Sequence, residues 1–128
     1  MATEVAFEYF FLHYAPNLTH ERTIPLGIIF LDPRAWTTGL CIARFFPAWQ
    51  SQVLRADPAA DIDVLEALTR EIERSLSVPE SRIEMLKMIE DSFSNQLRVS
   101  NRHTCKTSTP FLEIESLIST HSANDASS

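Results

Sequence analysis

The feature that most constrains the fold of this chain is a change in hydrophobic periodicity at Pro47. Before Pro47, three runs alternate their side chains with a period of two, which is typical of β-strands. After it, apolar residues recur at spacings of three and four, the stripe of an amphipathic helix. Strands and helices segregated in this way predict an α+β fold.

The three predicted strands cover residues 5–14, 23–31 and 38–46, and short turns join them. Both faces of the first run are largely apolar, which predicts a central strand covered on each side. Consecutive strands joined by brief turns favour an antiparallel meander at the N-terminus. Gly27, inside the second strand, predicts a bulge or a close packing approach.

Two helices follow and are expected to form a hairpin. Asp61 is placed to cap the first, whose inward stripe comprises Ile62, Leu65, Leu68, Ile72 and Leu76. The pattern breaks at residues 77–79 and restarts in a second helix. Its expected inward residues are Ile83, Leu86, Ile89 and Phe93, with Met85 and Met88 widening the stripe.

The remaining chain predicts a fourth strand over residues 96–100, a polar loop over 101–108 and a last helix. That helix has Pro110 in its first turn and is expected to end near His121. Its expected inward residues are Phe111, Ile114, Leu117 and Ile118.

These elements predict a single α+β domain over residues 1–121, since 128 residues suit one domain. An antiparallel sheet of three to four strands, beginning with the meander, is packed by an acidic helical hairpin and a C-terminal helix. Residues 122–128 are small and polar, and we expect a disordered tail there.

Composition excludes several classes of protein. The chain has only two glycines, Gly27 and Gly39, too few for a dinucleotide fingerprint or a phosphate-cradling loop. Its first residues lack the basic start of a secretory signal, and its longest apolar run, residues 25–31, is short of the roughly 20 residues of a spanning helix. We therefore expect a cytoplasmic protein in which Cys41 and Cys105 are free thiols.

Charge is distributed unevenly. The net charge of −6 is carried by residues 57–91, whereas residues 92–112 contain no acid. The net sign disfavours long-range attraction to nucleic acid or to an anionic membrane, but it leaves a local anion site open. The candidate binding site is a basic strip of Asn95, Arg98, Arg102 and Lys106, and its alternative interpretation is a solvated loop.

Catalytic and metal-binding patterns are weak. His20, Glu21 and Arg44 are the alternative catalytic candidates. The adjacent residues His20, Glu21 and Arg22 would point to opposite faces of a strand, so this triplet does not converge by itself. His103 and Cys105 are too few ligands to predict a metal site, and no cofactor is expected. Trp36 and Trp49 could be packed at the core edge or could anchor a partner.

Three segments together resemble a bacterial family, domain-of-unknown-function family 3037. They are YFFLHYAPNLTHERTIPLGIIFLDP (residues 9–33), RADPAADIDVLEAL (55–68) and MIEDSFSNQLRVS (88–100). The resemblance covers roughly residues 5–120 and implies a small cytoplasmic bacterial protein without an established activity, so no functional residues carry over. It also implies a protein partner, a HipA-like kinase.

The leading hypothesis is a noncatalytic protein-interaction module with an acidic helical hairpin on one side and a basic strip on the other. The alternative is an enzyme or nucleic-acid-processing component that uses the basic strip to bind phosphate. The sequence leaves the oligomeric state open.

Overall fold

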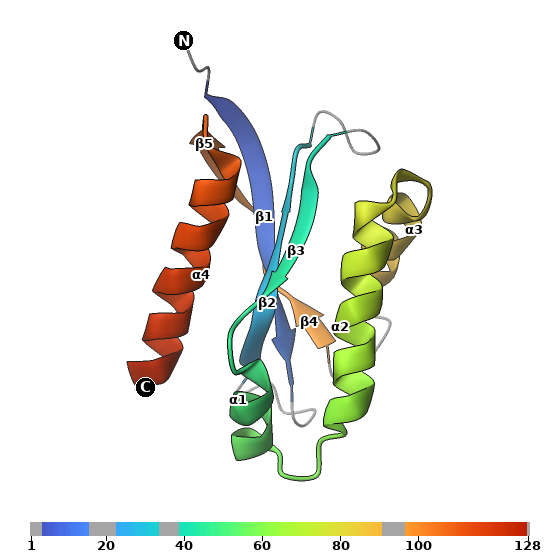
Figure 1. The fold of residues 1–128 in the computed structure, drawn as a ribbon, viewed down its shortest axis with the longest axis vertical. Helices are drawn as coiled ribbons and strands as arrows, with labels where there is room; N and C mark the ends of the chain where they lie inside the picture. Colours follow the sequence, from blue (N-terminus) through green and yellow to red (C-terminus); the bar gives the residue numbers. More distant parts are fainter. Residues whose placement is uncertain (1–3, 16–22, 34–38, 91–96, 128) are drawn as a thin grey trace.

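The computed structural model describes residues 4–15, 23–33, 39–90 and 97–127. One antiparallel sheet carries helices on both faces, which confirms the α+β fold (Figure 1). The elements are, in chain order, β1 (Val5–Tyr14), β2 (Ile24–Leu31), β3 (Cys41–Phe45), α1 (Trp49–Ala56), α2 (Ile62–Ser77), α3 (Pro79–Glu90), β4 (Leu97–Val99), β5 (His103–Thr107) and α4 (Pro110–Ser127).

The strand order β3-β2-β1-β4 confirms the N-terminal meander, with β1 in the interior of the sheet. Both β4 and β5 pair antiparallel with the edge of β1 that β2 leaves open. Leu12 pairs with Val99, whereas Tyr9 pairs with His103. Leu12 and Tyr9 are three positions apart on β1, whereas their partners Val99 and His103 are four positions apart. The segment between β4 and β5 therefore contains a bulge of one residue.

β5 corrects the prediction of a polar loop over residues 101–108. Its sequence, HTCKT, has no large apolar residue, so no hydrophobic alternation marks it. The strand forms because β1 carries backbone groups along Val5–Tyr9 that require partners. The short helix α1 was also not predicted, and its buried residues are Trp49 and Val53.

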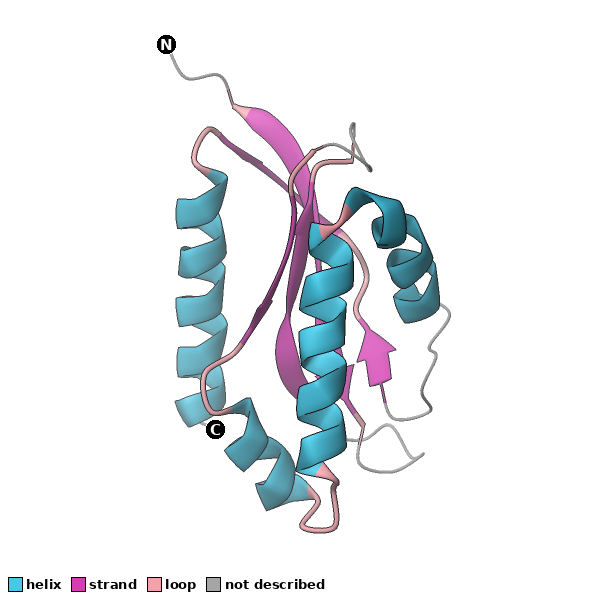
Figure 2. Ribbon diagram, turned by 45° about the vertical axis from the view of Figure 1, so that its right-hand side comes forward, coloured by secondary structure: helices cyan, strands magenta, loops and turns pink. Residues whose placement is uncertain are grey.

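The side chains of β1 divide between two apolar layers. Phe10 and Leu12 pack with α2 and α3 residues such as Ile72 and Leu86. Phe7 packs on the opposite face with Ile114 of α4. Figures 1 and 2 show the same division, with α4 on one side of the sheet and α2 on the other. The expectation of a central strand covered on both faces is thus confirmed.

Three residues predicted to face inward are exposed: Ile83, Met88 and Phe111. In α3 the buried stripe comprises Arg82, Met85, Leu86 and Ile89, so the helix is turned by one position to bring Arg82 inside. In α4, Ile114 is buried, and the helix continues past His121 to Ser127. It therefore includes most of the segment expected to be a polar tail. Phe93 lies outside the described residues.

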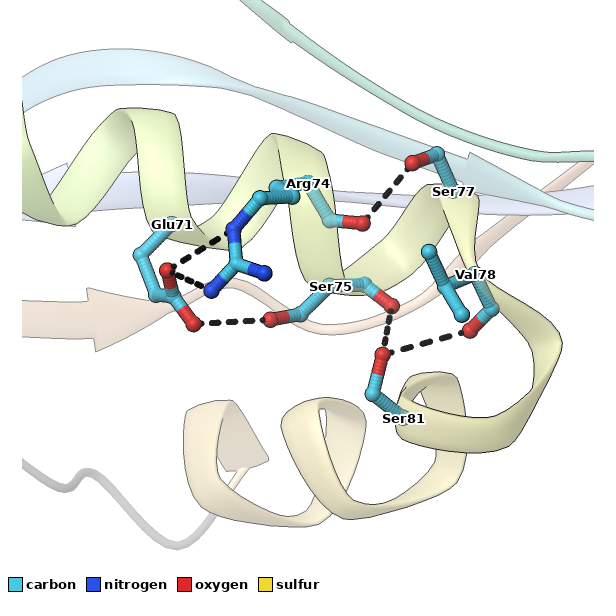
Figure 3. Close-up of polar contacts among 6 residues, drawn as sticks. All are labelled: Glu71, Arg74, Ser75, Ser77, Val78 and Ser81. Atoms are coloured by element: carbon cyan, nitrogen blue, oxygen red, sulfur yellow. Dashed lines mark hydrogen bonds and ion pairs between the residues drawn. The ribbon is translucent and has the colours of Figure 1, made fainter.

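Side chains satisfy the last carbonyls of α2 and shape its turn into α3 (Figure 3). The hydroxyl of Ser77 donates to the carbonyl of Arg74 at 2.7 Å, and that of Ser81 donates to the carbonyl of Ser75 at 2.8 Å. Buried Arg82 donates from Nε to the carbonyl of Leu76 at 2.8 Å and from Nη1 to that of Gly39 at 2.9 Å. These bonds replace the usual glycine cap of a helix C-terminus.

Two local predictions are confirmed. The carboxylate of Asp61 accepts a hydrogen bond from the Val64 amide at 3.2 Å and caps α2. A Cβ atom on Gly27 would overlap the Arg44 carbonyl oxygen and lie 2.8 Å from the Phe45 ring. The register between β1 and β2 also shifts between Leu12 and His13, beside that glycine. Among the described residues, no helix is both long and apolar enough to cross a membrane.

Candidate functional site

The basic strip is divided between the two faces of the sheet. Leu97 and Val99 pack toward α2, so Arg98 lies on the α4 side, where it pairs across the strands with His13. Arg102 lies on the α2 and α3 side, with its guanidinium 5.5 Å from the centre of the Phe10 ring. Lys106 pairs with Ala6 and shares the face of Arg102. Asn95 lies outside the described residues.

The bulge explains this division. Residues 98 and 102 would share a face in a regular strand, because side chains alternate with a period of two. The extra residue between β4 and β5 reverses the alternation. Sequence spacing could not show this, since no glycine or proline marks the bulge.

Arg102 also has a partner that its neighbours in the sequence do not provide. Its Nη1 lies 2.8 Å from Oε1 of Glu8, four positions before Leu12 on β1, and both side chains are about 30% exposed. The fold thus supplies a carboxylate to a segment that contains none. Arg102, Ser100, Val99 and Phe10 line a cavity of about 240 Å³ on this face.

The outer edge of β5 presents backbone groups to solvent. The amide of Phe11 donates to the Ser100 hydroxyl at 2.8 Å, and the Phe11 carbonyl accepts from the Ser100 amide at 2.9 Å. Odd-numbered residues of β1 therefore direct their backbone groups toward β4 and β5. Backbone groups alternate in an antiparallel ladder, so His103, Cys105 and Thr107 bond to β1 while Thr104 and Lys106 point away from it.

No other strand of the described chain pairs with that outer edge. Thr104 and Lys106 are both exposed, and Lys106 forms no ion pair with another described residue. We call the outward backbone groups of Thr104 and Lys106 the open edge. The open edge lies within residues 97–112, which contain no aspartate or glutamate.

The face of β5 toward α4 carries a ring cluster. His103 is exposed and stacks on Tyr9 with 5.1 Å between ring centres, and the Phe11 ring lies edge-on at 6.0 Å. Burial raises the pKa of Tyr9, with smaller contributions from nearby Cys105 and Glu113. Tyr9 is therefore uncharged at neutral pH, and its ring stacks on His103 from the neighbouring strand β1.

Of the three alternative catalytic residues, the structure describes Arg44. Arg44 on β3 pairs with Glu115 of α4, with Nη1 and Oε1 3.2 Å apart. His20 and Glu21 lie outside the described residues. Within the described ranges, no group of three His, Cys, Asp or Glu residues could hold a metal ion.

The two cysteines lie on opposite faces of the sheet and are free thiols, as expected. Cys41 packs with the α2 and α3 core, where burial raises the pKa of its thiol to about 11 despite the opposing influence of Arg82. Cys105 is less buried, and burial together with Glu113 raises its pKa. Trp49 is packed in the core with Val53 and Leu65, and Trp36 lies outside the described residues.

Comparison with protein-family models, with curated proteins and with solved structures gave no match. The resemblance to domain-of-unknown-function family 3037 therefore stays a prediction.

Proposed function

We propose that this protein is a noncatalytic protein-interaction module that binds an extended segment of a partner along the open edge of β5. The observation that carries the proposal is the outward backbone of Thr104 and Lys106, at the end of a sheet and inside a stretch without acids. An exposed sheet edge is a template for an added strand, because its amides and carbonyls match those of any extended chain.

The bulge supports β5, rather than β4, as the docking strand. It interrupts the ladder after Val99, so an added strand would find regular backbone spacing only along His103–Thr107. Two outward residues offer at most four backbone hydrogen bonds. Each such bond contributes roughly 0.5 to 1.5 kcal/mol net, so side-chain contacts must supply the rest of the affinity and the selectivity.

The geometry gives less support to the alternative, an enzyme or nucleic-acid component that holds phosphate on the basic strip. Arg98 and Arg102 lie on opposite faces, so one phosphate cannot contact both guanidinium groups. Arg102 is already paired with Glu8, and Arg44 with Glu115. We also propose a cytoplasmic location for the module, which suits its two free thiols.

A pair of variants at Thr104 tests the proposal. Thr104→Pro removes the outward amide without touching the ladder to β1, whereas Thr104→Ala keeps it. We expect peptides selected from a random display library on the unmodified protein to bind Thr104→Ala and to lose at least tenfold in affinity for Thr104→Pro. Equal thermal stability of the two variants is the control. Binding that survives Thr104→Pro, or a library that yields no binder, would overturn the proposal.

A further inference from the structure

We infer that the segment bound at the open edge alternates acidic and aromatic side chains, with the acids opposite Lys106 and an aromatic ring against His103. The inference rests on the proposed strand addition and names its partner by chemistry. It follows from what each face of β5 offers to the side chains of an added strand.

An added strand points alternate side chains to the two faces of the sheet. Those opposite Thr104 and Lys106 share the α2 and α3 side with Arg102, and those opposite His103 and Cys105 share the α4 side. Directly opposed residues on neighbouring strands have Cβ atoms roughly 4.5 to 5.5 Å apart, close enough for side-chain contact. Each face of β5 therefore selects every second residue of the partner.

The first face selects an acid. Lys106 is exposed and without an ion pair among the described residues, and Arg102 adds a second cation whose charge Glu8 partly offsets. No residue from 97 to 112 supplies a negative charge. A cross-strand carboxylate opposite Lys106 is the chemistry that complements this face, and a lysine or arginine there would be repelled.

The second face selects a flat ring. His103 is held on Tyr9 by stacking at 5.1 Å and is flanked by the edge of Phe11, yet it is itself exposed. A ring that stacks on His103 extends a column that is already ordered, so little side-chain entropy is lost on binding. Half-buried Cys105 completes an apolar floor beside it.

The same chemistry argues against a second copy of this chain as the occupant. A two-fold antiparallel pairing of β5 with itself would bring together two HTCKT segments, each with a lysine and neither with an acid. Such a pair leaves Lys106 without a carboxylate on the opposing strand. The partner is therefore a strand of different composition.

Labelled nine-residue peptides test the inference by fluorescence anisotropy on the full chain. The first alternates glutamate with phenylalanine, the second has lysine for glutamate, and the third has alanine for phenylalanine. We expect the first to bind best. His103→Ala should lower the affinity for the first peptide about two- to tenfold, the contribution of one aromatic contact. The affinity for the peptide with alanine in place of phenylalanine should not change.

Charge reversal gives the sharper readout. Lys106→Glu should weaken the glutamate peptide and strengthen the lysine peptide, whereas Lys87→Glu, the same change on exposed α3, should do neither. Equal effects of the two reversals, or self-association of the chain that Thr104→Pro abolishes, would overturn the inference. A different outcome is that the selected library peptides need the Thr104 amide while the protein binds the three designed peptides equally well. In that case the inference fails and the proposed function stands.

Discussion

The phenol of Tyr14, at the end of β1, donates a 2.8 Å hydrogen bond to Oδ2 of Asp57, in the turn between α1 and α2. Tyr14 is 1% exposed, and the other carboxylate oxygen of Asp57 accepts from the Ala59 amide at 3.3 Å. One buried side chain thus ties the interior strand to the turn that orients α2. The contact spans 43 positions, and no sequence pattern marks it.

Replacing Tyr14 tests how much its hydrogen bond to Asp57 stabilises the fold. Tyr14→Phe keeps the ring in its cluster with Leu26 and Trp49 but leaves Asp57 without its phenol donor. We expect the free energy of unfolding to fall by about 1.5 to 3 kcal/mol, the range for a hydrogen bond to a charged group. Urea denaturation measures it. A change below roughly 0.5 kcal/mol, as for a surface substitution, would mean that the bond is not stabilising.

The same bond predicts a loss of stability at alkaline pH. Burial, then the hydrogen bond and the charge of Asp57, raise the pKa of Tyr14 to about 12 from its ordinary 10. The folded state therefore holds this proton more tightly than the unfolded state. Its contribution is complete below pH 10 and is lost as the pH rises toward about 12. Urea denaturation across that window should show a steeper decline for the unmodified protein than for Tyr14→Phe, and parallel declines would contradict the assignment.

Gly27 predicts a steric effect rather than a polar one. Gly27→Ala places a methyl group against the Arg44 carbonyl and the Phe45 ring, where Gly27 of β2 pairs with Phe45 of β3. Because backbone atoms cannot give way as a side chain can, we expect a loss of about 1 to 3 kcal/mol, typical of overpacking. The melting temperature of Ala43→Gly, a change of the same size on the neighbouring strand β3, is measured for comparison. An unchanged melting temperature for Gly27→Ala would show that β3 can move outward.

The thiols should react in a fixed order. Cys41 is 8% exposed with a pKa raised to about 11, whereas Cys105 is only half-buried. Because the thiolate is the reactive form, we expect a thiol reagent at pH 8 to label Cys105 first and Cys41 only on unfolding. Mass spectrometry of partly labelled protein gives the order. Faster labelling of Cys41 in the folded state would place it outside the core.

Local signals explain which parts of the fold were predictable. The bounds of β1 and the Asp61 cap of α2 match the expectations because alternation and capping act within a few residues. β5 was not predictable because it forms by pairing with β1, about a hundred positions away in the chain. The bulge beside β5 was not predictable because no glycine or proline marks it. The burial of Arg82 was not predicted either, because one of the two carbonyls that accept its hydrogen bonds belongs to Gly39, 43 positions earlier in the chain.

The divided basic strip predicts that its members differ in what they stabilise. Arg102→Ala removes the ion pair with Glu8 and the contact with the Phe10 ring, both partly shielded from solvent, so we expect a loss of about 1 kcal/mol. Lys106→Ala removes an exposed charge without an ion pair among the described residues and should leave the melting temperature unchanged. Glu8→Gln removes the ion pair but not the contact of Arg102 with the Phe10 ring, so it should cost less than Arg102→Ala. The double variant should cost little more than Arg102→Ala alone, because both single variants remove the same ion pair. Additive losses in that cycle, measured by urea denaturation, would show that Arg102 and Glu8 act independently. A destabilised Lys106→Ala would show that this lysine supports the fold, and the open edge would then lose the charge that selects an acidic partner.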